Sequence, residues 1–348
     1  MNLKAWDDLL VAARSANLAG RVADVVMQRG GLPSVPAPVR PHILTATRLS
    51  LHQREAIARE CRELEAALAP LRVPVLLLKG AAYVMSGRQA AHGRLFGDID
   101  ILVPRVSLNE AEAALMRRGW SVGPMDPYDI RYYRRWMHEL PPMTHRERGT
   151  ALDVHHHILP LTARWTTDVE ALLARREPVP GSIFSTLAPE DLVVHSAVHL
   201  FHEGQLRNGL RDLCDLDALL REFGEGRPGF AASVVSRSVE LGLAWPVDLA
   251  LHLCVELLLT PVDAATLDEV RRRSGLGRAH RALLSWAYRR ALLPAYPPQH
   301  APAVALARAL LYLRAHALRM PPHRLAWHLA RKAVLRTVKH SSRAGPMA

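Results

Sequence analysis

The sequence predicts an α/β (α+β) protein with one small region of short strands, preceded and followed by helices. Strand-like apolar runs alternate with helical segments in the middle of the chain, at 73–78, 98–103 and 150–155. Apolar residues recur at helical spacing before this region and again from Pro189 onward. The domains expected are an N-terminal helical segment (1–70), a strand-containing domain (71–178), a helical domain (179–270) and a basic helical C-terminal region (271–348).

The N-terminal segment is expected to contain two helices. The first covers 3–29 and ends where Gly30-Gly31 and several prolines interrupt the apolar pattern. The second covers about 42–69 and ends before Pro70. It carries opposite charges four residues apart, a spacing that places them side by side on a helix.

The strand-containing domain is expected to begin with alternating strands and helices. A strand at 73–78 leads into a helix that starts at Ala81, and a second strand covers 98–103. Ser107 is followed three residues later by a glutamate, which is the spacing of a capped helix start. The next helix is therefore expected over 108–118.

Amino-acid composition predicts the structure of the remainder of this domain and the position of its C-terminal boundary. Residues 121–148 are rich in Pro, Tyr, Arg and Met, and hairpin strands and loops over the cleft are expected there. A further strand carries Asp153. Pro178 and the Pro-Gly pair soon after it indicate a domain boundary. The helical domain then begins at Pro189, with acidic residues in the first turn, where they interact favourably with the helix dipole.

The cysteines and the hydropathy predict a cytoplasmic protein. Cys61, Cys214 and Cys254 are far apart and form no CxxC pair, so free thiols in a reducing compartment are expected. The N-terminus lacks the basic start and long apolar region of a signal peptide. No segment is long and apolar enough to predict a transmembrane span.

Charge is distributed unevenly along the chain. The net charge is +12, yet residues 1–270 hold 29 basic and 33 acidic residues. Residues 271–348 contain 16 lysines and arginines and no acidic residue, so all of the excess positive charge lies there. This distribution suits an anionic partner of residues 271–348.

Two aspartates lie inside the apolar run 98–103. On a strand, Asp98 and Asp100 point to the same face while the isoleucines between and after them point to the other. Two adjacent carboxylates repel each other, and their burial is costly without a cation. Mg²⁺ is the usual ion for a site made of carboxylate oxygens. The pattern therefore predicts a divalent metal site, and a solvated strand face is the alternative.

Lys79-Gly80 lies where the first strand ends and a helix begins. Backbone N–H groups at such a turn form an anion site together with the helix dipole, and glycine allows a phosphate to approach closely. Arg94, four residues before Asp98, is positioned to neutralise a carboxylate or a triphosphate, or to lie on the surface. In this strand–helix–strand order we interpret Lys79-Gly80 as a phosphate-binding turn.

A third carboxylate, Asp153, leads a run of three histidines. On a strand Asp153, His155 and His157 share one face, which is typical of a metal or phosphate cleft. A histidine-rich zinc site is the competing interpretation, but the matched carboxylates favour a hard metal ion.

Two further polar sets lie in the helical domain. Three histidines share one helix face and form either a zinc site or ordinary cleft and core histidines: His195, His199 and His202. On the next helix, three aspartates face either the cleft or solvent, next to Arg211: Asp212, Asp215 and Asp217.

These motifs resemble an uncharacterised bacterial nucleotidyltransferase family of the superfamily that includes DNA polymerase beta and kanamycin nucleotidyltransferase. Lys79-Gly80-Ala81 is similar to the family's Lys-Gly-Ala motif, and Arg94 with Asp98-Ile99-Asp100 to its Arg-x-x-x-Asp-Ile-Asp motif. Asp153-Val154-His155 takes the place of its Glu-Leu-His strand. The resemblance covers about residues 70–225. The chain differs in having Ala81 where the superfamily usually has Gly or Ser, and Asp153 where the family commonly has Glu.

The resemblance implies a small mixed-sheet core and a metal-dependent transferase. It would move a nucleoside monophosphate from a nucleoside triphosphate such as ATP to an acceptor hydroxyl, with release of pyrophosphate. The acceptor could be a small molecule, a peptide or protein, or RNA. The implied catalytic residues are also the ligands of Mg²⁺, or alternatively Mn²⁺: Asp98, Asp100 and Asp153. The implied nucleotide-binding residues are Lys79, Gly80, Ala81, Arg94 and His155.

A second interpretation gives the basic C-terminal region the main role. A catalytically degenerate nucleotidyltransferase fold would then bind nucleic acid or an anionic membrane through residues 271–348. Uncompensated cations attract phosphate backbones. Residues 303–319 and 324–339 also interleave apolar and basic residues as interfacial helices do.

Overall fold

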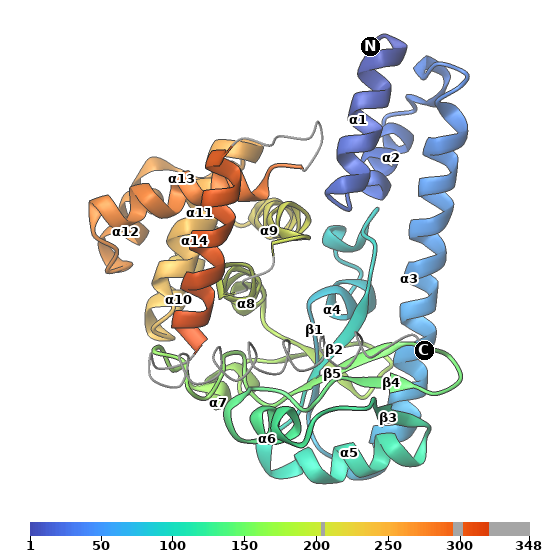
Figure 1. Cartoon of the computed structure of the whole chain (residues 1–348), viewed down its shortest axis with the longest axis vertical. Helices are drawn as coiled ribbons and strands as arrows, with labels where there is room; N and C mark the ends of the chain where they lie inside the picture. The colour runs from blue at the N-terminus through green and yellow to red at the C-terminus, as the bar shows by residue number, and fades with distance from the viewer. Residues whose placement is uncertain (203–205, 295–301, 320–348) are drawn as a thin grey trace, which may run out of the picture.

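The computed structural model describes residues 1–202, 206–294 and 302–319, and it shows a mixed sheet with helices on two sides of it (Figure 1). The α-helices are α1 (Leu3–Ser15), α2 (Ala19–Gln28), α3 (Arg40–Leu68), α4 (Lys79–Met85), α5 (Leu108–Arg117), α6 (Pro127–Trp136), α7 (Val169–Leu173), α8 (Pro189–His202), α9 (Gly209–Gly224), α10 (Phe230–Glu240), α11 (Ala244–Leu258), α12 (Ala264–Arg273), α13 (Arg278–Leu292) and α14 (Pro302–Arg319). The strands are β1 (Val75–Leu78), β2 (Asp98–Leu102), β3 (Trp120–Val122), β4 (Met143–His145), β5 (Ala151–His155), β6 (Glu177–Pro178) and β7 (Phe184–Thr186).

The sheet confirms the predicted α/β class and its mixed character. Its strand order is β3-β4-β5-β2-β1-β7-β6. At its centre β2 runs antiparallel to β1 and parallel to β5, and β1 runs parallel to β7. All four residues of β1 are buried, as expected of a central strand covered on both faces.

Helices from the two ends of the chain lie on opposite sides of the strands (Figure 1). The long helix α3 runs along one side, and helices α8 to α14 form the other group. Tyr83 of α4 and Ser196 of α8 share a hydrogen bond of 2.7 Å between their hydroxyl oxygens, which joins the helical group to the sheet region. Helix α8 is thereby held close to the carboxyl end of β1.

The predicted helix over 3–29 was wrong, because two helices occupy this range. Helix α1 ends at Ser15, and α2 begins at Ala19. Between them Asn17 adopts a positive φ of 58°, in the left-handed region that asparagine tolerates better than most residues. The apolar spacing continues across this turn, so periodicity alone did not reveal it.

The prediction of hairpin strands and loops over 121–148 was correct only in part. Strand β4 is present, but the ten-residue helix α6 precedes it. The Asp126 side chain accepts a hydrogen bond from the backbone N–H of Tyr128, and Pro127 fills the first helical position. By contrast, α5 begins where predicted, yet the Ser107 side chain makes no capping hydrogen bond.

Other features agree with the sequence. Helix α3 (Arg40–Leu68) matches the helix predicted over 42–69. The three cysteines are free thiols. Within the described part of the chain, no helix is long and apolar enough to cross a membrane. The division into four domains stays a prediction.

The N-terminal helices contact the loop before β2 through two glycines. Helices α1 to α3 share a small apolar core of their own. A methyl group on Gly20 of α2 would overlap the carbonyl oxygen of Gly93, and it would lie 3.3 Å from Cβ of Ser50. Gly20 therefore allows α2 to pack directly on the loop backbone.

We expect Gly20→Ala to lower the free energy of unfolding by about 1–3 kcal/mol, because α2 must move away from the loop. Chemical denaturation measures this change. Gly123→Ala is the matched control, since nothing lies within 4 Å of the added methyl group there. Equal stability of the two variants would show that the close approach has no energetic role.

Candidate functional site

The three predicted aspartates lie on neighbouring strands at the centre of the sheet. Asp98 and Asp100 are two residues apart on β2 and therefore point to the same face. Asp153 on β5 is directly paired with Asp100 in the parallel register, so its side chain is on that face as well. Asp100 is buried, Asp153 is half-buried and Asp98 is exposed.

The surroundings shift the pKa values of the three carboxyl groups in different directions. Although the side chain of Asp98 is exposed, the surrounding protein partly desolvates its carboxylate, and this together with the charge of Asp100 raises the pKa of Asp98. Burial, followed by the charges of Asp100 and Glu139, raises the pKa of Asp153 to about 7. Burial would also raise the pKa of Asp100, but Lys79 and His155 together hold it well below its usual value. The cluster thus carries one firmly ionised carboxylate and two whose ionisation another cation would favour.

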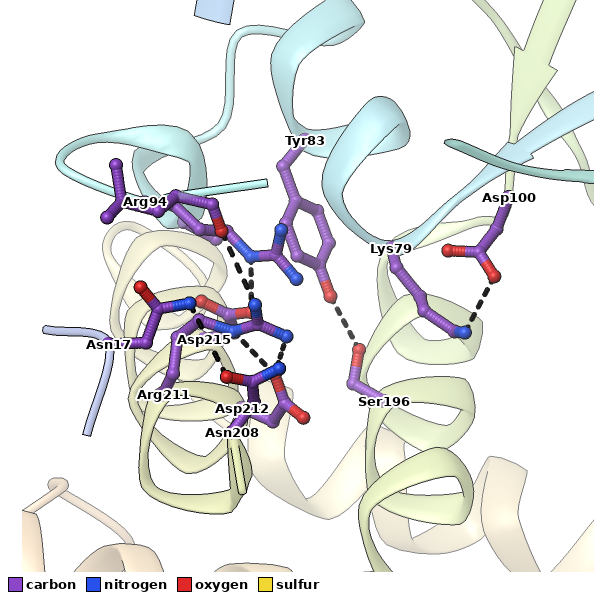
Figure 2. A network of polar contacts seen from close by, with 12 residues as sticks. Asn17, Lys79, Tyr83, Arg94, Asp100, Ser196, Asn208, Arg211, Asp212 and Asp215 are labelled. Atoms are coloured by element: carbon purple, nitrogen blue, oxygen red, sulfur yellow. Dashed lines mark hydrogen bonds and ion pairs between the residues drawn. The ribbon is translucent and has the colours of Figure 1, made fainter. Parts of the chain in front are cut away.

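Lys79 provides one positive charge at this site. Its Nζ lies 2.7 Å from Oδ1 of Asp100 (Figure 2). The backbone of Lys79 has a φ of 46°, which is uncommon for a residue with a side chain. It lies at the junction of β1 and α4, so the turn directs the ammonium group toward the carboxylate of the adjacent strand.

The next residue, Gly80, has no room for a side chain. A Cβ on Gly80 would lie 2.5 Å from Nη1 of Arg94 and 2.7 Å from Cδ1 of Phe96. Ala81, by contrast, is buried in the hydrophobic core. A backbone contact from Ala81 to a nucleotide stays a prediction.

Arg94 belongs to a group of charges that reaches from the loop before β2 to helix α9 (Figure 2). Its Nε donates to Oδ2 of Asp215 at 2.8 Å, and Arg21 of α2 donates to the other oxygen of the same carboxylate. One turn earlier on α9, Arg211 donates to Oδ1 of Asp212 at 2.7 Å. The sequence alone leaves open whether these aspartates face the cleft or solvent.

A cavity of about 380 Å³ lies between the aspartates of β2 and the helices α8 and α9. The residues that line it on the sheet side include Lys79, Gly80, Arg94, Asp98 and Asp100. Those on the helical side include Ser196, His199, Asn208, Arg211, Asp212 and Asp215. Asp212 and Asp215 therefore face the cleft. Asp217 does not line it, and binds Arg221 and Thr260 instead.

His155 contacts the carboxylate of Asp100 but is not among the residues that line the cavity. Its Nε2 is 3.0 Å from Oδ1 of Asp100, and its Nδ1 is 3.4 Å from Oε2 of Glu139. Burial alone would lower the pKa of His155, but the hydrogen bond with Asp100 and the charge of Glu139 raise it. A direct role of His155 in nucleotide binding stays a prediction.

Glu139 and its neighbour His138 were missed in the sequence. Both lie in the segment expected to form hairpins and loops, where no residue spacing signals them. Among the described residues, one set of three side chains could share a metal ion, and it consists of His138, Glu139 and His155. Neither the three aspartates nor the α8 histidines form such a set.

The three α8 histidines occupy different surroundings. His199 lines the cavity, whereas His195 and His202 are buried. Burial lowers the pKa of His195 and of His202 to about 3, and it lowers the pKa of His199 well below its usual value. They are therefore neutral cleft and core histidines, one of the two alternatives left open by the sequence.

Acidic residues nearby neutralise part of the charge in the described portion of the basic C-terminal region. Five of its arginines pair with acids of α11 and α12: Arg271, Arg272, Arg273, Arg281 and Arg289. Residues 303–319 are helical, within α14. The interfacial helix expected over 324–339 lies outside the described residues.

Comparison with known proteins gives one match. The sequence model of a family described as "Uncharacterised nucleotidyltransferase" matches residues 2–259, which is most of the chain. No curated protein and no solved structure was found to match.

Proposed function

Because the chain belongs to this family of uncharacterised nucleotidyltransferases, we propose that it moves a nucleoside monophosphate from a nucleoside triphosphate to an acceptor hydroxyl. The observation that carries the proposal is the cavity at the ends of β1 and β2. It brings two aspartates together with Lys79, Gly80 and Arg94 in one space. Anionic and cationic groups in one cavity suit a ligand that consists of a metal ion and a polyphosphate.

The aspartates offer the oxygen ligands that a divalent cation prefers, and they would have to move closer together for all three to share one ion. Asp98, Asp100 and Asp153 share one face of the sheet, and the pKa of two of them is raised partly by the charge of Asp100. These residues would hold Mg²⁺, or alternatively Mn²⁺, both of which prefer oxygen ligands. When bound, the ion would supply positive charge to the phosphates and polarise the phosphoryl group.

The remaining residues bind the triphosphate and handle the acceptor's proton. Lys79 and Arg94 would balance the negative charge of the phosphates, and Gly80 lets the phosphates approach the start of α4. The acceptor oxygen attacks the α-phosphorus, the bond to the β-phosphate breaks, and pyrophosphate leaves. The Asp153 carboxylate, which shares a sheet face with Asp100 but does not line the cavity, would accept the proton of the acceptor hydroxyl in its ionised form, which a bound cation favours.

Calorimetry with Mg²⁺ and each nucleoside triphosphate in turn tests the proposal. We expect the wild type to bind at least one triphosphate in a metal-dependent way and Asp98→Asn/Asp100→Asn to lose this binding. Asp98→Asn alone should weaken it, and this variant leaves the buried Lys79–Asp100 pair intact.

Asp217→Asn is the matched control, because Asp217 lies on α9 outside the cavity. Thermal unfolding of each variant establishes that it is folded. If folded wild type binds no triphosphate, the site is degenerate, and the basic C-terminal region becomes the leading candidate for function.

A further inference from the structure

A second group of potential metal ligands includes His155, whose Nε2 faces Asp100 and whose Nδ1 faces Glu139. It consists of His138, Glu139 and His155, and one donor atom from each lies within 4.8 Å of the others. Its two imidazoles distinguish it from the all-carboxylate site proposed above.

Backbone hydrogen bonds fix the positions of these three residues. The segment around Glu139 pairs with the end of β5, and Glu139 and His155 face each other in an antiparallel bridge. The N–H of His156 donates to the carbonyl oxygen of His138 at 2.8 Å, and the N–H of Leu140 donates to that of Val154 at 2.9 Å. The ligands thus come from backbone that is ordered before any ion arrives, which lowers the cost of binding.

The spacing of the donor atoms suits a tetrahedral ion. His155 Nδ1 and Glu139 Oε2 are 3.4 Å apart. Two donors that each bind Zn²⁺ at about 2.0–2.1 Å with tetrahedral angles lie about 3.3 Å apart. The rings of His138 and His155 have centroids 5.2 Å apart. The buried Nδ1 of His138 has no hydrogen-bond partner within the described chain.

The other side of His155 has the environment that metal-binding histidines usually have. A metal-bound imidazole typically donates its second N–H to a carboxylate, which fixes the tautomer and the orientation of the ring. Here Nε2 of His155 lies 3.0 Å from Oδ1 of Asp100. An ion on Nδ1 would place the proton on Nε2, so that Asp100 accepts a hydrogen bond and keeps its orientation toward the cavity.

We propose that His138, Glu139 and His155 bind a divalent transition-metal ion, represented by Zn²⁺, with Asp100 as the hydrogen-bond acceptor of His155. Two imidazoles and one carboxylate favour such an ion over Mg²⁺. The ion has a positioning role: it orients a carboxylate of the neighbouring cavity without touching a nucleotide. In the alternative, no ion binds, and a protonated His155 bridges Asp100 and Glu139.

The test is titration of the metal-stripped full-length protein with Zn²⁺, in competition with a chromophoric chelator and without Mg²⁺ or nucleotide. We expect one equivalent to bind, with affinity at least 10-fold lower in His138→Ala and in Glu139→Gln. Asp100→Asn should weaken binding by about 10- to 100-fold, as loss of an outer-shell partner does. Bound Co²⁺ should give visible absorption of the strength typical of tetrahedral coordination.

Two controls separate this site from other metal binding. Asp98→Asn should leave Zn²⁺ affinity unchanged, which distinguishes the site from the aspartate site of the transferase. His280→Ala should also have no effect, because His280 is exposed on α13. The proposal is overturned if wild type binds no Zn²⁺, if both His138→Ala and Glu139→Gln bind it normally, or if Asp98→Asn abolishes binding. None of these results depends on whether a nucleotide binds.

Discussion

Asp215→Asn is expected to lower the free energy of unfolding by about 3–5 kcal/mol, the usual cost of removing one partner from a buried ion pair. The Asp215 carboxylate accepts hydrogen bonds from two arginines, Arg21 and Arg94. An asparagine can accept from one of them, but its NH₂ group would then face the other. Arg94 is only 6% exposed, so its charge would stay buried without its main compensating carboxylate.

A bound triphosphate should recover part of this loss. If Arg94 contacts the phosphates, they supply the negative charge that the variant lacks. The increase in melting temperature caused by Mg²⁺ and a triphosphate should therefore be larger in Asp215→Asn than in wild type. The opposite order would argue against a contact between Arg94 and the nucleotide.

Asp217→Asn, on the same helix, is the control for stability. Asp217 pairs with Arg221, whose side chain is 43% exposed, and a surface pair of this kind contributes only about 0–1 kcal/mol. Chemical denaturation of both variants measures the difference. If Asp215→Asn unfolded within 1 kcal/mol of Asp217→Asn, the buried cluster would not depend on its central carboxylate.

The placement of Asp98 and Asp100 could be predicted because it depends only on local geometry. A strand repeats every two residues, so two aspartates separated by one isoleucine must share a face. The arrival of Asp153 beside Asp100 depends on the parallel register of β2 and β5. The local pattern predicts a strand around Asp153, but pairing between distant strands is not encoded in local spacing.

Residues that reach the site from distant segments could not be found in this way. His138 and Glu139 arrive because a segment outside the regular strands pairs with the end of β5. Arg21 comes from α2, nearly two hundred residues from Asp215 in sequence. The same limit applies to the aspartates of α9. Their spacing predicts a helix, but which of its faces lines the cavity depends on how α9 packs beside the sheet.

Burial of His202 should make the fold sensitive to acid. His202 is at the end of α8, where its ring clusters with those of Trp165 and Trp245, and neither ring nitrogen has a hydrogen-bond partner within the described chain. Burial, together with the charges of Arg314 and Arg319, lowers its pKa to about 3. In the unfolded chain the pKa returns to about 6.5. Between these values only the unfolded chain binds the proton.

The sign of the pH effect follows from this difference. The stabilising contribution of the neutral His202 is complete above pH ~6.5 and is lost as the pH falls toward the folded-state pKa. From pH 7 to pH 5 the loss is about 2 kcal/mol for this one group. His195, whose pKa is also lowered to about 3, should contribute in the same direction.

His202→Phe isolates this contribution. A phenyl ring keeps an aromatic group beside the two tryptophans, and it removes both the titration and the unpartnered nitrogens. We expect the variant to be at least as stable as wild type at pH 7 and about 2 kcal/mol more stable relative to wild type at pH 5. Chemical denaturation over this pH range measures both quantities.

His280→Phe, at an exposed position of α13, should leave the pH dependence unchanged. A pH dependence of His202→Phe that parallels that of wild type would mean that His202 is protonated in the folded protein, and that its burial beside the tryptophans does not keep it neutral.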